Sequence, residues 1–324
     1  MAKASEKLLL RTAESLLKTS LAAKPSEKLL IITDVATYPI GRAFFEAGLE
    51  VGAESILTVM KERTRHGEEP PSLVAEAWES CDIFIAPTKY SLSNTQARKA
   101  ANQAGARGAT MPTITTAMFK TGAITADCSK VSSLCERMGA LMDKASEARV
   151  TSGAGTDITM SIEGRLKGRD TGLLWKPGDF GNLPAGEVYV APVEGTAEGT
   201  LVFDGSIASV GVLKKPVVVT VKEGFATDIT GGPEAKKFNM LLSSVQKKEA
   251  YNVAELGVGC NPKARLIGNP LEDEKVLGTV HVALGDNSTI GGNVQAGIHL
   301  DGIMLKPTMF LDDKIVIKDG AWAI

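Results

Sequence analysis

Histidine, cysteine and aromatic residues are scarce in this sequence. It contains three histidines, four cysteines and 5% aromatic residues in 324 positions. Cys81, Cys128, Cys135 and Cys260 show neither C-x-x-C spacing nor the framework of a small secreted protein. We therefore expect reduced, mostly buried thiols and a cytoplasmic protein.

Further absences exclude classes of partner. Basic and acidic residues nearly balance, with a formal net charge of −2, so no basic surface indicates nucleic acid or anionic lipid. No run approaches about 18 consecutive apolar residues, so no membrane span is expected. The first 25 residues carry charges every few positions, which predicts an amphipathic helix rather than a signal peptide.

What is present is ample apolar material, 44% of the chain, in a length that favours two domains. Segments of helical spacing alternate with short apolar runs at 29–35, 54–60, 82–87 and 105–112. This alternation predicts an α/β fold with βαβ units and a parallel sheet, a Rossmann-like αβ domain over residues 1–149. The turn after its first strand, TDVATYPIG, lacks a G-x-G-x-x-G fingerprint and the chain has no Walker A motif, so nothing places a nucleotide here.

The pattern changes after a helix that we expect to end near Ala148. Short alternating strands with Gly and Pro turns are predicted over 149–165, 186–192, 199–207, 215–229, 264–269, 278–285 and 314–320. One helix over 231–248 interrupts them, and Pro233 suits its N-terminal position. We expect a mainly β, metal-binding domain over residues 150–324.

Two of the three histidines, His281 and His299, fall in this second half, and Asp301 follows His299 at i+2. On a strand His299 and Asp301 would point to one face, and imidazole with carboxylate is a usual ligand set for zinc, iron or manganese. Glu187 and Glu255 stand among apolar neighbours, where an acid is costly unless it is paired or metal-bound. These five residues are the candidate ligands.

Other interpretations stay open at this point. An isolated H-x-D and a single glutamate at a strand end are common without metal. Glu274, in the charged stretch EDEK, is a weaker sixth candidate, and His66, in TRHGEEPP, is interpreted as a loop residue.

The sequence around these residues resembles the M29 (aminopeptidase T-like) metallopeptidase family. Blocks similar to those of the family occur in order from residue 66 to residue 304: HGEEPPSLVAEAW, PTKYSLSNTQARKAA, RVTSGAGTDITMSIEGR, NLPAGEVYVAP, NVAELGVG, HVALG and HLDGIM. The resemblance implies that a dinuclear metal centre is bound by Glu187, Glu255, His281, His299 and Asp301. It also implies a carboxylate ahead of His281, for which Glu274 is the nearest candidate, displaced by two residues. A family tyrosine seven residues after His281 is replaced by Ser288.

The resemblance thus implies a hydrolase in which two divalent ions (Zn, Co or Mn) activate water on an amide or short peptide substrate. We expect Glu255 to bridge the ions and Asn287 to replace the tyrosine as donor to the oxyanion. A 2,5-dihydroxypyridine dioxygenase shares the fold and uses two histidines and an aspartate on one Fe(II), which His281, His299 and Asp301 would also satisfy. A non-catalytic metal or small-molecule binder is the third possibility. The hydrolase is favoured, because two extra acids exceed what one ferrous ion needs.

The resemblance also implies a homodimer. The segment 200–225, with its apolar runs TLVF and PVVVTV, is the expected contact region.

Overall fold

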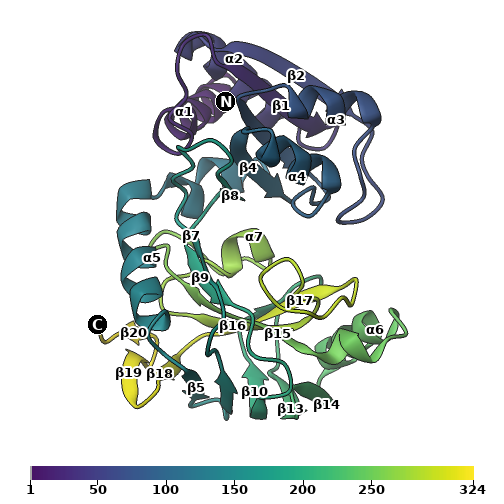
Figure 1. Cartoon of the computed structure of the whole chain (residues 1–324), viewed down its shortest axis with the longest axis vertical. Coiled ribbons are helices and arrows are strands. Elements are labelled where there is room, and N and C mark those ends of the chain that lie inside the picture. The colour runs from purple at the N-terminus through teal and green to yellow at the C-terminus, as the bar shows by residue number, and fades with distance from the viewer. Residues whose placement is uncertain (1) are drawn as a thin grey trace. The chain divides into compact units, whose positions relative to one another are not determined.

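The computed structural model describes the backbone of residues 2–324 and side chains from Ala4 onward. The chain divides into two compact units (Figure 1). The αβ unit comprises the residues up to Ser132 together with Thr171–Ala185, and the β unit comprises Ser133–Asp170 and Gly186–Ile324. No helix within residues 2–324 is long and apolar enough to cross a membrane.

The αβ unit contains the expected parallel sheet. Its five strands lie in the order β2 (Glu54–Met60), β1 (Lys28–Asp34), β3 (Ile83–Thr88), β4 (Arg107–Pro112) and β8 (Phe180–Asn182). The helical segments are α1 (Ala2–Thr19), α2 (Tyr38–Val51), α3 (Ser72–Glu79), α4 (Gln96–Gln103), η1 (Met118–Lys120) and η2 (Gly122–Thr125). Six of the seven residues of β1 and all of β3 are buried, as is usual for parallel strands covered on both faces. Trp78 and Phe84 meet edge to face in the core, with ring centroids 5.1 Å apart.

The β unit contains two antiparallel sheets. The first has the order β14 (Phe225–Gly231), β13 (Val217–Lys222), β10 (Glu198–Phe203), β6 (Asp157–Ser161), β5 (Glu147–Ser152), β18 (Pro307–Leu311), β19 (Lys314–Lys318) and β20 (Ala321–Trp322). The second has the order β12 (Gly211–Val212), β11 (Ser206–Ile207), β17 (His299–Met304), β16 (Val280–Gly285), β15 (Val253–Gly259), β9 (Glu187–Val190) and β7 (Lys167–Asp170). The remaining helices are α5 (Cys128–Met142), α6 (Pro233–Ser243), η3 (Lys248–Tyr251) and α7 (Pro270–Asp273).

The two sheets of the β unit pack through one face of the second sheet. Phe203 of β10 lies against Gly302 of β17, where a β carbon would be only 2.5 Å from its ring. Gly302 alternates with Asp301, so the carboxylate of Asp301 points to the opposite face of the sheet. That opposite face carries the candidate metal centre.

The predicted α/β fold class is confirmed, but the division of the chain differs from a single boundary at 149/150. The helix expected to reach Ala148 ends at Met142, and β5 already begins at Glu147. Residues 171–185 return to the first unit because β8 pairs in parallel with β4 as an edge strand. A three-residue strand has too few positions to show a hydrophobic period, so no sequence pattern predicts it.

The strand predicted over 264–269 is absent, and these residues form the approach to α7. The carboxylate of Asp273 accepts hydrogen bonds from the backbone N–H groups of Ile267 and Gly268, and Glu272 accepts one from Arg265. The backbone N–H groups that a strand would use to pair with a neighbouring strand therefore donate to side-chain carboxylates instead.

Candidate metal centre

Register places the candidate ligands of three neighbouring strands on one face of the second sheet. His281 of β16 lies opposite Gly257 of β15, which in turn lies opposite Tyr189 of β9. Glu255 precedes Gly257 by two residues, and Glu187 precedes Tyr189 by two residues. Because residues at i and i+2 of a strand share a face, the side chains of Glu187, Tyr189, Glu255 and His281 all point to the same face of the sheet.

The fourth strand, β17, completes the arrangement. Ile303 lies opposite His281, and Asp301 and His299 follow toward the start of β17 at steps of two. Four adjacent strands therefore supply all five candidate ligands, although the residues span more than a hundred positions of the chain.

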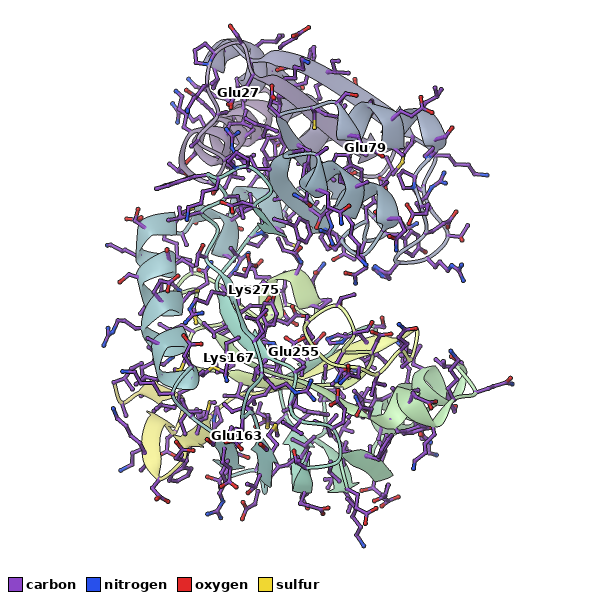
Figure 2. The ribbon with its side chains drawn as sticks, viewed as in Figure 1. Glu27, Glu79, Glu163, Lys167, Glu255 and Lys275 are labelled. Atoms are coloured by element: carbon purple, nitrogen blue, oxygen red, sulfur yellow. The ribbon has the colours of Figure 1, made fainter. Side chains whose placement is uncertain are left out.

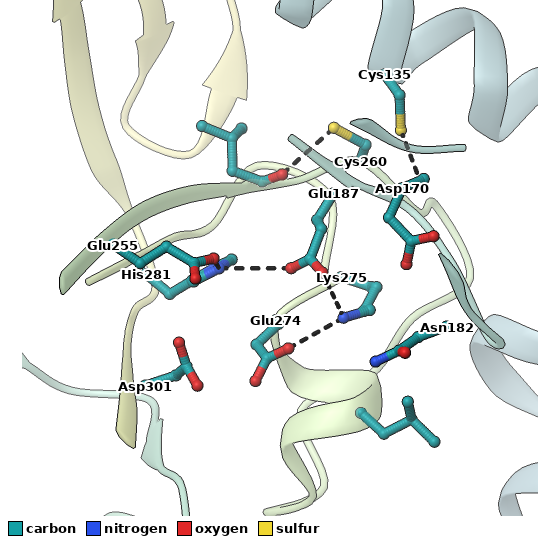
Figure 3. Close-up of polar contacts among 12 residues, drawn as sticks. Cys135, Asp170, Asn182, Glu187, Glu255, Cys260, Glu274, Lys275, His281 and Asp301 are labelled. Carbon is teal, nitrogen blue, oxygen red and sulfur yellow. Dashed lines mark hydrogen bonds and ion pairs between the residues drawn. The ribbon is translucent and has the colours of Figure 1, made fainter. Parts of the chain in front are cut away.

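The carboxylate of Glu255 lies between the two imidazoles. Its Oε1 is 3.4 Å from His281 Nε2 and its Oε2 is 3.3 Å from His299 Nε2. His299 Nε2 also lies 3.3 Å from Asp301 Oδ1, and His281 Nε2 lies 3.5 Å from Glu187 Oε2. Figure 3 shows Glu255, His281, Glu187 and Asp301 gathered around one space.

These residues form two groups, each compact enough to hold a metal ion. One group is Glu187, Glu255 and His281, and the other is Glu255, His299 and Asp301. Glu255 belongs to both, which is the position expected of a bridging carboxylate. The trio His281, His299 and Asp301, expected around one ion, is thus divided between two groups that share an acid.

The unpaired polar atoms at the centre fit a metal. Within the described residues, Glu187 Oε2 and both ring nitrogens of His281 are buried and have no hydrogen-bond partner. Buried polar atoms are nearly always paired, because an unpaired one costs about 1–3 kcal/mol. Carboxylate oxygens and imidazole nitrogens aimed at one space are the donor set that zinc, iron and manganese take.

His299 is held in the orientation of a metal ligand. Its Nδ1 lies 2.7 Å from the backbone carbonyl oxygen of Asp286, to which a protonated Nδ1 donates a hydrogen bond. With the proton on Nδ1, the lone pair of Nε2 is free, and Nε2 faces Glu255 and Asp301. The side chain of His299 is 32% exposed, so it is the ligand most open to solvent.

The electrostatics of the cluster favour bound positive charge. Burial alone would lower the pKa of His281, but Glu255 and Glu187 outweigh it and raise the pKa to about 9. The pKa of His299 is raised well above its usual value against burial by Asp301 and Glu255. Burial would raise the pKa of Asp301, but His299 and His281 hold it below its usual range. The carboxylates therefore attract cations, whether protons on the imidazoles or a metal ion.

Lys275 is a member of the site that sequence reasoning missed. Its side chain is fully buried, and Nζ donates to Glu187 Oε1 at 2.8 Å and to Glu274 Oε2 at 3.0 Å (Figure 3). Burial would lower its pKa, but these two acids raise it well above the usual value. A lysine within EDEK looks like part of a solvated charge run, so only its contact with Glu187 reveals its place.

Tyr189 was also missed. Its ring lies over Gly168, where a β carbon would be 2.2 Å from Cζ, and it shares the sheet face of the candidate ligands. Burial, together with Glu255, holds the pKa of its hydroxyl well above the usual value, so the phenol stays protonated. Its position two residues after Glu187 on a strand was the available signal.

Two of the expected site residues lie outside the metal groups. Glu274 pairs with Lys275 and belongs to neither group, and burial holds its pKa well above the usual value. Asn287 is fully buried in the loop before β17, where Nδ2 donates to Glu194 Oε1 and Oδ1 accepts from Val294. The role of Asn287 as a donor to an oxyanion stays a prediction, and these two hydrogen bonds favour a role in holding the loop instead.

His66, interpreted as a loop residue, does lie in a loop. Its Nδ1 accepts a hydrogen bond from the backbone N–H of Ser91 at 3.0 Å.

Solved structures share this fold. The structure of 2,5-dihydroxypyridine dioxygenase from Pseudomonas putida KT2440 superposes with a TM-score of 0.83 and 19% identity, covering 97% of this chain and 96% of that one. Wild-type AmpT from Thermus thermophilus superposes with a TM-score of 0.73 and 16% identity, covering 98% and 99%. Both fold relationships predicted from the sequence, to the M29 aminopeptidases and to the dihydroxypyridine dioxygenase, are confirmed.

Sequence comparison distinguishes between the two. The 2,5-dihydroxypyridine 5,6-dioxygenase of Pseudomonas putida KT2440 is 28% identical over 192 residues, which are 56% of this chain and 55% of that protein, so the match spans about half of each. The family model described as NicX, 2,5-dihydroxypyridine 5,6-dioxygenase, matches residues 16–323. Since that match covers nearly the whole chain, the chain belongs to the 2,5-dihydroxypyridine 5,6-dioxygenase (NicX) family.

Proposed function

We propose that this protein is a metal-dependent dioxygenase that opens the ring of a hydroxylated pyridine, with one Fe(II) ion held by His281, His299 and Asp301. The observation that carries the proposal is the placement of both imidazoles at the two oxygens of Glu255, with Asp301 beside His299. Two imidazoles and one aspartate are the donor set of the 2-His-1-carboxylate iron oxygenases. Membership of the NicX family supports this function over the hydrolase that the resemblance to the M29 peptidases implies.

The ion, when bound, would supply the open positions at which dioxygen and a hydroxypyridine oxygen can meet. Glu255 would accept a hydrogen bond or proton from a ring hydroxyl of the substrate, because its carboxylate is central to the cluster. Its pKa is lowered, against burial, by His281 and His299, so it is an ionised acceptor. Tyr189 would donate its phenol proton in a hydrogen bond to a polar ring atom.

A dinuclear hydrolase of the M29 kind is the second candidate. The specific observation in its favour is the pair of ligand groups that share Glu255, since two ions bridged by one carboxylate would use this arrangement. Zn, Co or Mn would then be the metals, and short peptides or amides the substrates.

One experiment separates the candidates. The protein is loaded anaerobically with Fe(II), and oxygen uptake is measured with 2,5-dihydroxypyridine while the ring absorbance is followed. A parallel sample loaded with Co(II) or Mn(II) is assayed on leucyl and arginyl anilides, with Ser288→Tyr as a variant that restores the tyrosine of the peptidases. We expect one O₂ consumed per ring opened and negligible anilide cleavage. Anilide turnover on the order of 10 s⁻¹, a typical enzyme rate, without ring opening would overturn the proposal.

The homodimer and the cytoplasmic location remain predictions. Light scattering at micromolar concentration tests the first, since the mass of a single chain is 34.1 kDa and a dimer would give twice that value.

A further inference from the structure

We propose that Lys275 limits this centre to a single metal ion, because its ammonium group occupies the cation position beside Glu187 that a second ion would require. The inference deepens the proposed function, since it rests on a one-ion centre and names the residue that enforces it.

The backbone path explains how a lysine reaches this buried place. Gly259 lies opposite Glu187 in the β9–β15 register. A β carbon on Gly259 would be 2.0 Å from the carbonyl oxygen of Val276 and 2.9 Å from the carbonyl carbon of Lys275. The absence of a side chain on Gly259 therefore lets the segment after α7 pass directly against β15, next to Glu187. The N–H of Asn261 donates to the Lys275 carbonyl at 2.8 Å and fixes this approach.

The contacts of Lys275 assign it to one half of the cluster. Nζ donates to one oxygen of Glu187, and the other oxygen of Glu187 faces His281 at 3.5 Å. An ion in the group of Glu187, Glu255 and His281 would therefore bind a carboxylate whose charge Lys275 already neutralises. Two cations on one buried carboxylate repel strongly, because the interior screens charge far less than water does.

The other half of the cluster has no such cation. Among the side chains described from Ala4 onward, no lysine or arginine forms an ion pair with Glu255 or Asp301. Glu255 pairs with His281 and His299, and Asp301 pairs with His299. The group of Glu255, His299 and Asp301 thus keeps its full attraction for a divalent ion. The single ion of the proposed function therefore has its place beside His299 and Asp301, with His281 on the other side of Glu255, and the ammonium of Lys275 takes the role of a second ion beside Glu187.

The test is a count of bound ions with Mn²⁺ as the probe. Lys275→Met removes the charge with little change of volume, and Lys275→Gln removes it while keeping a donor for Glu187. Lys275→Arg retains the charge. Lys167→Met is the matched control, because Lys167 is another buried lysine of the β unit whose Nζ donates to the Ile162 carbonyl at 3.0 Å (Figure 2). Stoichiometry is measured by calorimetry and by the electron paramagnetic resonance spectrum of bound Mn²⁺, with circular dichroism as the check of folding.

We expect one Mn²⁺ per chain in the wild type, Lys275→Arg and Lys167→Met, and two in Lys275→Met or Lys275→Gln, with the broadened spectrum of a coupled pair. A count that stays at one in a folded charge-removing variant overturns the inference, and so does a wild type that already binds two. The proposed function fails by a separate result, namely no ring opening by the Fe(II)-loaded wild type, which leaves the Mn²⁺ counts unaffected.

Discussion

Gly257 lies opposite His281 in the β15–β16 register, and a β carbon at position 257 would stand 1.9 Å from His281 Nε2. The space for this imidazole is therefore provided by the missing side chain of the neighbouring strand. Such a distance is far below van der Waals contact, so the imidazole and a side chain at 257 cannot coexist in this geometry.

Gly257→Ala is accordingly expected to displace the imidazole of His281 and weaken metal binding at least about tenfold, a loss usual when the orientation of a ligand is disturbed. Overpacking should also lower the free energy of unfolding by about 1–3 kcal/mol. Calorimetric titration with Mn²⁺ and urea unfolding measure the two effects. Gly153→Ala is the control, since a β carbon there would have no neighbour within 4 Å apart from the adjoining residues of the chain. Unchanged metal affinity in Gly257→Ala would contradict the placement of His281.

His299→Ala should abolish metal retention through dialysis while leaving the fold largely intact. The side chain of His299 is partly exposed, so its loss removes little packing, but it removes the ligand that Asp286 orients. Metal content after dialysis and the circular dichroism spectrum are the measurements. His66→Ala, in an exposed loop, is the control and should retain metal. A His299→Ala protein that keeps its full metal content would show that this imidazole is not a ligand.

The sequence predicted the first four parallel strands and the mainly β second half, because these segments have a clear hydrophobic period or are bounded by Gly and Pro turn residues. It also singled out five residues that lie close together in the structure, since an acid among apolar residues is costly to bury without a partner. Their role as metal ligands stays a prediction. Lys275 could not be found this way. Lys275 reaches the site only because its segment passes close to β15. Gly259 permits this long-range backbone contact, and no local sequence pattern predicts it.

Asn287 shows the limit of reasoning from closeness in sequence. Proximity in sequence to His281 suggested a donor at the reaction centre, whereas its side chain turns into its own loop and bonds Glu194. A neutral amide can serve either role, and only the tertiary position of Glu194 decides between them.

The stability of the metal-free protein should fall as pH rises from about 6.5 to about 9. The pKa of His281 is raised from an unfolded value of about 6.5 to about 9, so the stabilisation from its bound proton is complete below the first value and lost through the second. The raised pKa of His299 acts in the same direction. Up to about 3 kcal/mol would be lost from His281 alone.

Urea unfolding of protein treated with a chelator, at several pH values in this range, measures the slope. His281→Gln should reduce it, and saturating metal should remove it, because metal binds the neutral imidazole. A flat profile in the metal-free wild type would mean that the carboxylates do not hold a proton on His281.

Asn287→Ala should destabilise the loop that orients His299, rather than remove a catalytic donor. The amide links Glu194 at 3.0 Å and the N–H of Val294 at 2.8 Å, and the preceding residue, Asp286, supplies the carbonyl that accepts from His299. Leaving these buried partners unpaired costs about 1–3 kcal/mol of folding free energy. Because the loop then holds the Asp286 carbonyl less firmly, metal affinity should fall together with stability.

The companion measurement distinguishes this role from that of an oxyanion donor. A donor acting only on the reacting group would lower turnover and leave both thermal stability and Mn²⁺ affinity unchanged. Ser288→Ala is the matched control within the same loop, since its exposed hydroxyl bonds only the side chain of Asp286. Its effect should stay within about 0.5 kcal/mol, as for most surface substitutions. If Asn287→Ala keeps the wild-type melting temperature and metal affinity but loses turnover, the amide serves the substrate, and the loop-holding role assigned here is wrong.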